Sequence, residues 1–155
     1  YWSANVFRTD IEDLIGGFPV TNTDRARIDG LELELVQNIA SWQTRTSLSF
    51  LNPTNRDTGE LLENRVKRTL KINADRGFGN WQLGATVLAQ SERAGGTYSD
   101  PVPGFATFDL RGGYEINRHL DLRAKLGNVL DKDYRTRDGY NQPGRTVTVT
   151  LNAEL

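Results

Sequence analysis

Apolar and polar residues alternate with a period of two along most of this chain, and this pattern restricts the possible fold more than any other feature. Such alternation is typical of β-strands whose two faces meet different surroundings. It recurs in segments around residues 31–35, 42–50, 70–74, 81–89, 108–116, 120–126 and 146–155, after a less regular opening strand at residues 1–13. No segment carries an apolar stripe at helical spacing. The sequence therefore predicts an all-β chain of eight strands.

The connections between the predicted strands fall into two length classes. Short turns near residues 37–41, 77–80 and 117–118 alternate with long polar loops at residues 13–24, 52–65, 92–105 and 131–144. Outer-membrane barrels have this arrangement, with short turns on the periplasmic side and long loops outside the cell. The loop lengths favour an antiparallel transmembrane β-barrel in the outer membrane. A soluble β-sandwich or lipocalin-like barrel, with its apolar face turned inward, remains the alternative.

Three tryptophans support a membrane position. Trp42 and Trp81 each follow a short turn on the apolar side of a strand, and Trp2 takes the matching place if the first strand runs the same way. Aromatic residues at one repeated height are typical of the girdle where barrel strands cross the membrane interface. We therefore predict that these residues contact outer-membrane lipid, the alternative being three core tryptophans of a soluble sheet.

The composition narrows the possible functions. The chain of 155 residues carries 19 basic and 20 acidic residues, a balance that argues against a nucleic-acid partner. It has no cysteine and a single histidine, His119, so we expect no metal site and no resident cofactor. No combination of nucleophile, histidine and acid stands out, so an enzyme is the least favoured class. The mean hydropathy of −0.56 is compatible with strands that are apolar on one side only.

Several motifs point to one family. Residues 126–134 read Leu-Gly-Asn-Val-Leu-Asp-Lys-Asp-Tyr, residues 143–145 read Pro-Gly-Arg, and a last alternating strand follows. Upstream, residues 26–32 read Ala-Arg-Ile-Asp-Gly-Leu-Glu, and residues 62–66 read Leu-Glu-Asn-Arg-Val. These motifs resemble the C-terminal part of TonB-dependent outer-membrane receptors over nearly the whole chain. The resemblance implies the final eight strands of a barrel of about 22 strands.

The same resemblance shapes the expected domain organisation. Residues 1–155 correspond to a C-terminal barrel segment, with no plug domain, no TonB box and no signal peptide among them. Energy coupling through a TonB-type protein would then depend on residues outside this segment. The family commonly ends in an aromatic residue, whereas this sequence ends in Leu155. Asp131–Asp133 and Pro143–Gly144 have a simpler interpretation as a polar strand exit and a turn, which favours a structural role for the terminal motif.

The resemblance also suggests a transported ligand. The ending is especially similar to that of cobalamin (vitamin B12) receptors of the BtuB type, and siderophore receptors share much of it. Tyr140 matches a position associated with substrate in the cobalamin receptors, whereas their paired arginines correspond here to Asn64 and Arg65. The resemblance therefore implies active uptake of cobalamin, with a ferric siderophore as the alternative.

The chemistry of the predicted loops indicates where a ligand would bind. Exterior aromatic rings can lie against a large ring system, and guanidinium groups can bind amide oxygens, phosphate or an acidic chelate. The candidate ligand-binding residues are Tyr98, Tyr134, Tyr140, Arg65 and Arg137. A self-contained eight-stranded barrel with a structural or adhesive role remains open at this point.

Overall fold

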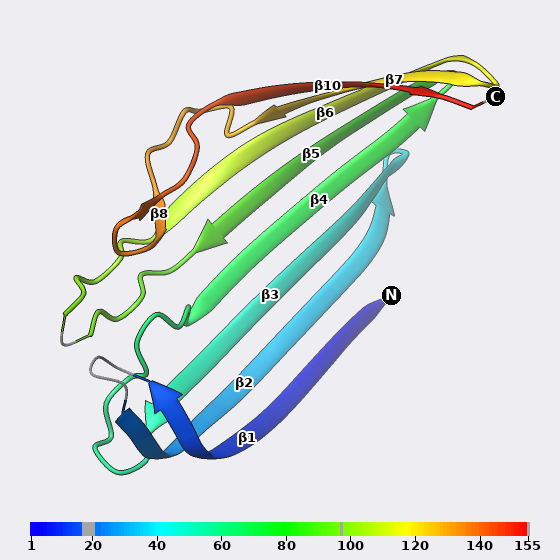
Figure 1. The fold of residues 1–155 in the computed structure, drawn as a ribbon. Helices are drawn as coiled ribbons and strands as arrows, with labels where there is room; N and C mark the ends of the chain where they lie inside the picture. Colours follow the sequence, from blue (N-terminus) through cyan, green and yellow to red (C-terminus); the bar gives the residue numbers. More distant parts are fainter. Residues whose placement is uncertain (17–20, 97, 155) are drawn as a thin grey trace.

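The computed structural model describes residues 1–16, 21–96 and 98–154, and its main element is one antiparallel sheet of eight strands (Figure 1). The strands adjoin one another in chain order: β1 (Trp2–Gly16), β2 (Thr21–Ile39), β3 (Trp42–Asn55), β4 (Arg68–Phe78), β5 (Trp81–Gln90), β6 (Phe105–Asn117), β7 (Leu120–Gly127) and β10 (Thr146–Ala153). The short strands β8 (Arg135–Arg137) and β9 (Tyr140–Asn141) pair with each other between β7 and β10. The predicted all-β architecture with eight main strands is confirmed.

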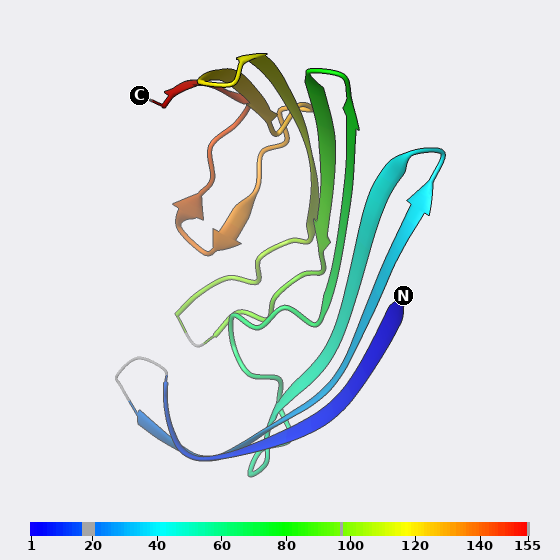
Figure 2. The same cartoon turned by 90° about the vertical axis from the view of Figure 1, so that its right-hand side faces the viewer.

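The register keeps the apolar side chains of neighbouring strands in rows. Ile72 of β4 lies opposite Thr46 of β3 and Val87 of β5, and Val87 lies opposite Phe108 of β6. Because side chains alternate between the two faces of a sheet, one face is apolar and the other is polar. The sheet is strongly curved, with the β8–β9 hairpin on its concave side (Figure 2).

The polar face is the concave one. A hollow of about 510 Å³ is lined both by Tyr134 of the last loop and by polar-face residues such as Lys71, Asn73 and Asp109. The last loop therefore covers the polar face, and the apolar face is convex. We call the apolar face the outward face and the polar face the inward face.

The two kinds of connection lie at opposite ends of the sheet, as predicted (Figure 1). At one end are turns of two residues, Ala40–Ser41, Gly79–Asn80 and Arg118–His119. Ala40 and Ser41 both have positive φ, 48° and 69°, as a type I′ hairpin turn requires. At the other end are the first long loop (residues 56–67), the second (residues 91–104) and the last (residues 128–145).

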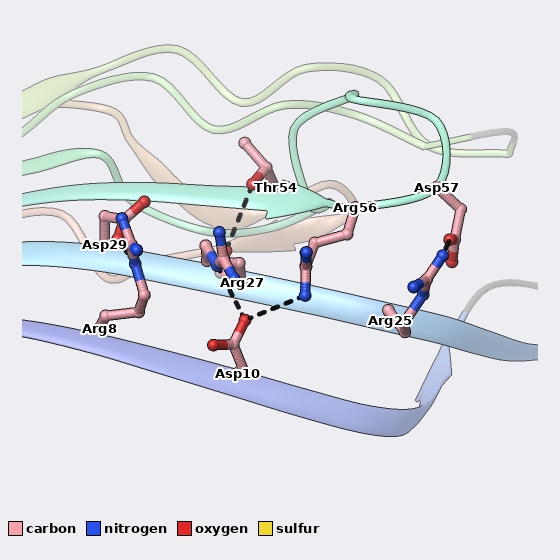
Figure 3. A network of polar contacts seen from close by, with 8 residues as sticks. All are labelled: Arg8, Asp10, Arg25, Arg27, Asp29, Thr54, Arg56 and Asp57. Carbon is pink, nitrogen blue, oxygen red and sulfur yellow. Dashed lines mark hydrogen bonds and ion pairs between the residues drawn. The ribbon is translucent and has the colours of Figure 1, made fainter.

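The prediction of a loop at residues 13–24 is wrong for most of that segment. β1 and β2 continue through it as a paired hairpin, with Gly16 opposite Thr21, and residues 17–20 lie outside the described part of the chain. Ion pairs join the two strands just before this extension, including Arg8–Asp29 at 2.6 Å and Arg27–Asp10 at 2.8 Å (Figure 3). Leu14 and Ile15 are consecutive apolar residues and lie opposite Thr23 and Asn22, so the alternation of apolar residues that marks the other strands is missing here.

The sheet forms a single layer with little core. The solvent-accessible surface is 10,691 Å², whereas a compact protein of this mass exposes about 7,900 Å². Large apolar side chains of the outward face are open to the surroundings, such as Val6, which is 79% exposed. The soluble alternative, which needs this face turned inward around a core, is therefore wrong for this structure.

The sheet is also open. β1 and β10 form its two edges, and no pairing joins them among the residues that the structure describes. A self-contained barrel of eight strands requires that pairing, so the structure does not support this alternative. The last strand, predicted to run to the C-terminal residue, ends at Ala153, and Leu155 lies outside the described residues.

Candidate functional site

The first and second long loops are joined by backbone hydrogen bonds above the end of the sheet. Asn64 N donates to Ala94 O at 3.1 Å, and Val66 forms a β-bridge with Arg93. Arg93 forms a second bridge with Val102, which is almost fully buried. Because all three segments pair side by side, the two loops form one ordered layer.

A buried arginine links this layer to the last loop. Arg93 is only 6% exposed, and its Nη2 donates to Gln90 Oε1 at 2.6 Å. Its guanidinium lies 5.8 Å from the centre of the Phe105 ring, and that ring lies 4.3 Å from the ring of Tyr134 at an angle of 38°. Burial lowers the pKa of Arg93. This cation–aromatic stack fastens the second and last loops to the start of β6.

The predicted ligand residue Tyr134 therefore has a packing role, and its two neighbours in the stack were not among the residues predicted from the sequence. Arg93 follows the fifth strand in a segment without periodicity, and Phe105 stands at the expected end of a loop. The residues next to these two positions in the sequence do not indicate the contact, because the stack forms between loops that are distant in the sequence.

The motif at residues 128–145 folds as a clasp between β7 and β10. Asn128, which is 5% exposed, accepts a hydrogen bond from Lys132 N at 2.9 Å and donates to Lys132 O at 2.9 Å and Pro143 O at 3.4 Å. Asp131 Oδ1 accepts from Arg145 N at 2.7 Å, and Arg145 Nε donates to Val129 O at 3.0 Å. These contacts fit the structural role expected for the motif, because they connect the two ends of the last loop.

Two predicted ligand residues meet at the tip of the same loop. The guanidinium of Arg137 lies 5.7 Å from the ring centre of Tyr140, across the β8–β9 turn where Gly139 has a φ of 76°. Tyr140 is 61% exposed, so its ring is open to a ligand. Asp138 holds the hairpin in place, because its carboxylate accepts from Arg135 at 2.9 Å and from Asp100 N of the second loop at 3.2 Å.

The other two predicted ligand residues come from the other two loops. Arg65 is exposed in the first long loop, and Tyr98 is exposed near the tip of the second. The five candidates therefore lie on three loops at one end of the sheet, with Arg137 and Tyr140 in contact. A hollow of about 690 Å³ between the second and last loops adds Lys132, Asp133 and Arg135 to this end.

The inward face below the loops carries a charged network. Arg111 of β6 reaches across Gly84 of β5 to Asp75 of β4, with 2.7 Å between Nη2 and Oδ1, and it also contacts the hydroxyl of Thr86. On the neighbouring strands, Lys125 pairs with Asp109 at 3.1 Å. Mixed charges on the inward face are typical of wide barrels with a filled or hydrated interior. No cluster of metal-binding side chains occurs among the described residues.

The three tryptophans stand at the end with the short turns. Trp2, Trp42 and Trp81 are the first residues of β1, β3 and β5, and the ring of Trp81 lies 4.6 Å from that of Tyr114. Trp2 and Trp81 are largely exposed on the outward face. No helix of the described chain has the length and apolar character needed to cross a membrane.

Comparison with known proteins identifies the architecture. A family profile described as "TonB dependent receptor-like, beta-barrel" matches residues 1–129. The chain belongs to this family of TonB-dependent receptor barrels. The family and the similar solved structures are transport receptors of the outer membrane.

Several solved TonB-dependent receptors share the fold over 98% of this chain. A copper transporter, OprC, has a TM-score of 0.83 at 23% identity. The siderophore receptor PiuA from Acinetobacter baumannii has a TM-score of 0.79 at 20% identity, and the ferric-catecholate import receptor Fiu from E. coli K12 has 0.79 at 22%. This chain spans 29%, 26% and 25% of their respective lengths.

Proposed function

We propose that this chain supplies barrel wall and exterior loops to an outer-membrane receptor that imports a metal-bearing ligand. The observation that carries the proposal is the meeting of three long loops at one end of a TonB-dependent receptor barrel sheet, with Arg137 and Tyr140 exposed there as a cation–aromatic pair. An exposed ring beside a guanidinium offers a flat apolar surface and hydrogen-bond donors to the same ligand.

A ferric siderophore is the ligand class that the similar receptors favour. PiuA is described as a siderophore receptor and Fiu as a ferric-catecholate import receptor, and this chain shares their fold. Arg65, Arg137 and Lys132 at the loop end offer positive charge to an acidic chelate. Cobalamin is the second candidate, supported by Tyr140 at the position that resembles the cobalamin receptors.

The remaining parts of the transport cycle belong to the proposed longer receptor. The charged inward face, with the Arg111–Asp75 and Lys125–Asp109 pairs, offers partners for a plug domain inside the barrel. A hollow of about 800 Å³ on this face, at the end with the short turns, has room for a few side chains of such a domain. Energy would come from a TonB-type protein that contacts a TonB box outside this segment.

Ligand binding to the receptor that contains this chain tests the proposal. A ferric catecholate, a ferric hydroxamate and cyanocobalamin are titrated against the wild type and against a double variant with Arg137→Ala and Tyr140→Ala. We expect one ferric chelate to bind and the double variant to bind it about tenfold more weakly. The matched control is Arg118→Ala, an arginine in a turn at the opposite end of the sheet.

The titration separates the candidate ligands. Binding of cyanocobalamin alone would establish the second candidate. Unchanged affinity for the bound ligand in the double variant would contradict the placement of the site at the last loop, and binding of none of the three would contradict the proposed ligand class.

A further inference from the structure

The outward face has a hollow where its apolar band ends on the side of the long loops. The hollow measures about 710 Å³ and lies across β1 to β4. Its lining is apolar on one side and charged on the other, and includes Val6, Leu31, Phe50, Arg8, Asp29 and Arg68. It is separate from the loop-end site, because no candidate ligand residue contributes to it.

The register shows that these six side chains share the outward face. Leu31 lies opposite Val6 on one side and Phe50 on the other, and Phe50 lies opposite Arg68. The next pair on the same face, toward the loops, is Arg8 opposite Asp29. The boundary between apolar and charged rows therefore runs through the hollow.

The charges around the hollow leave a positive excess. Arg8 uses Nε for Asp29, at 2.6 Å, while its side chain remains 60% exposed, so other donors of its guanidinium are open to the surroundings. Arg68 is exposed, and no ion pair involves it among the residues that the structure describes. Two guanidinium groups against one carboxylate attract an anion.

The arginines farther along the β1–β2 hairpin differ from Arg68, because each of them has a carboxylate partner. Arg27 and Arg56 both pair with Asp10, at 2.8 and 3.6 Å, and Arg25 pairs with Asp57 at 2.6 Å (Figure 3). Among the described arginines of β1, β2 and the start of β4, Arg68 is therefore the one without an ion pair, and it lies beside the apolar band.

We propose that this hollow binds a phosphate-bearing lipid of the outer leaflet. The acyl chain lies against Val6, Leu31 and Phe50, and the phosphate sits between Arg8 and Arg68. A soluble anion makes no favourable contact with the apolar side of the hollow. A lipid contacts the apolar side with its acyl chain and the charged side with its phosphate, and it is continuous with the lipid around the outward face. The inference rests on the proposed membrane position of the sheet.

The test measures lipid binding to the receptor that contains this chain, purified in a mild detergent. Diphosphorylated lipid A is added, and bound lipid is counted by native mass spectrometry. We expect Arg68→Gln to weaken the binding several-fold and the double variant with Arg8→Gln to weaken it about tenfold or more. Arg68→Gln breaks no ion pair, so its effect does not depend on a disturbed hairpin.

The matched control is Arg76→Gln, which changes an exposed arginine on the outward face of the same strand, near the short turns. We expect it to bind lipid A like the wild type. Equal binding by all variants would overturn the proposal. So would displacement of the lipid by millimolar inorganic phosphate, or an arginine-dependent complex with a protein in place of the lipid.

Two further readouts separate this inference from the proposed function. Uptake of the imported ligand by the arginine variants should equal that of the wild type, because the hollow is not part of the loop-end site. Quenching of Trp2, Trp42 and Trp81 by brominated lipid reports whether the outward face meets the membrane. Normal quenching without arginine-dependent lipid binding would refute the lipid site alone, and absent quenching would refute the membrane position on which it rests.

Discussion

At the scale of single residues, the strand register explains why particular residue types stand at certain motif positions. Gly30, in the Ala-Arg-Ile-Asp-Gly-Leu-Glu segment, lies opposite Phe7 on the inward face. A Cβ at position 30 would stand 2.2 Å from the Phe7 ring, so the ring occupies the space that a side chain would need. An aromatic ring over a cross-strand glycine covers the backbone that glycine leaves open.

Substitution of Gly30 by alanine should therefore destabilise the sheet. The Phe7 ring has to move away, and we expect a cost of about 1–3 kcal/mol in the free energy of unfolding. Thermal unfolding of the receptor in detergent measures it. Gly112→Ala is the control, because a Cβ there meets no atom within 4 Å. Equal stability of the two variants would contradict the account of Gly30.

Asn128 supports the clasp in two ways. Its φ of 48° lies in the left-handed region, which asparagine tolerates, and its side chain makes three hydrogen bonds. Asn128→Gly keeps the backbone conformation and removes these bonds, and we expect it to destabilise the receptor by about 1–3 kcal/mol. The exposed Asn141, changed to glycine, is the control. A loss no larger than that of the control in the same thermal assay would show that the clasp contributes little.

At the scale of elements, the strands were predicted correctly from the sequence wherever one face of the strand is apolar. β3, β5 and β7 have regular alternation, and the structure places them within a few residues of the predicted segments. The end of the β1–β2 hairpin, within residues 13–24, was missed, because its apolar residues Leu14 and Ile15 are consecutive and do not alternate with polar ones. Cross-strand pairs depend on register, which a single sequence does not display at such positions.

The ion pairs of this hairpin should be weak individually, because they are exposed. Asp10 contacts both Arg27 and Arg56, so Asp10→Asn removes two pairs at once. We expect backbone amides of residues 8–12 to exchange hydrogen about twofold faster in this variant. The effect should shrink at about 1 M salt, where charges are screened within about 3 Å.

The same exchange experiment carries its control. Amides of β5 and β6, which are far from Asp10 in the sheet order, should exchange as in the wild type. Uniformly faster exchange would indicate a global loss of stability, and an unchanged rate at residues 8–12 would show that the ion pairs do not hold the hairpin.

At the scale of the whole molecule, the molecule is a curved single layer that exposes an apolar outward face. Period-two alternation and sorted loop lengths were sufficient to predict this architecture. The loop-end site was predicted only in part, because Arg137 and Tyr140 lie close in sequence whereas the Arg93–Phe105–Tyr134 stack joins distant segments. Ligand identity depends on such long-range placement, so composition and local motifs leave it open.

We propose that the outward face of this sheet meets lipid and that the inward face meets the barrel interior. Spin labels at successive positions 82–87 of β5, in the receptor within outer-membrane vesicles, test it most directly. Labels at 83, 85 and 87 should collide mainly with oxygen, which concentrates in lipid, and labels at 82, 84 and 86 mainly with a water-soluble nickel complex. Accessibility without this period of two, or with the two sets exchanged, would contradict the account.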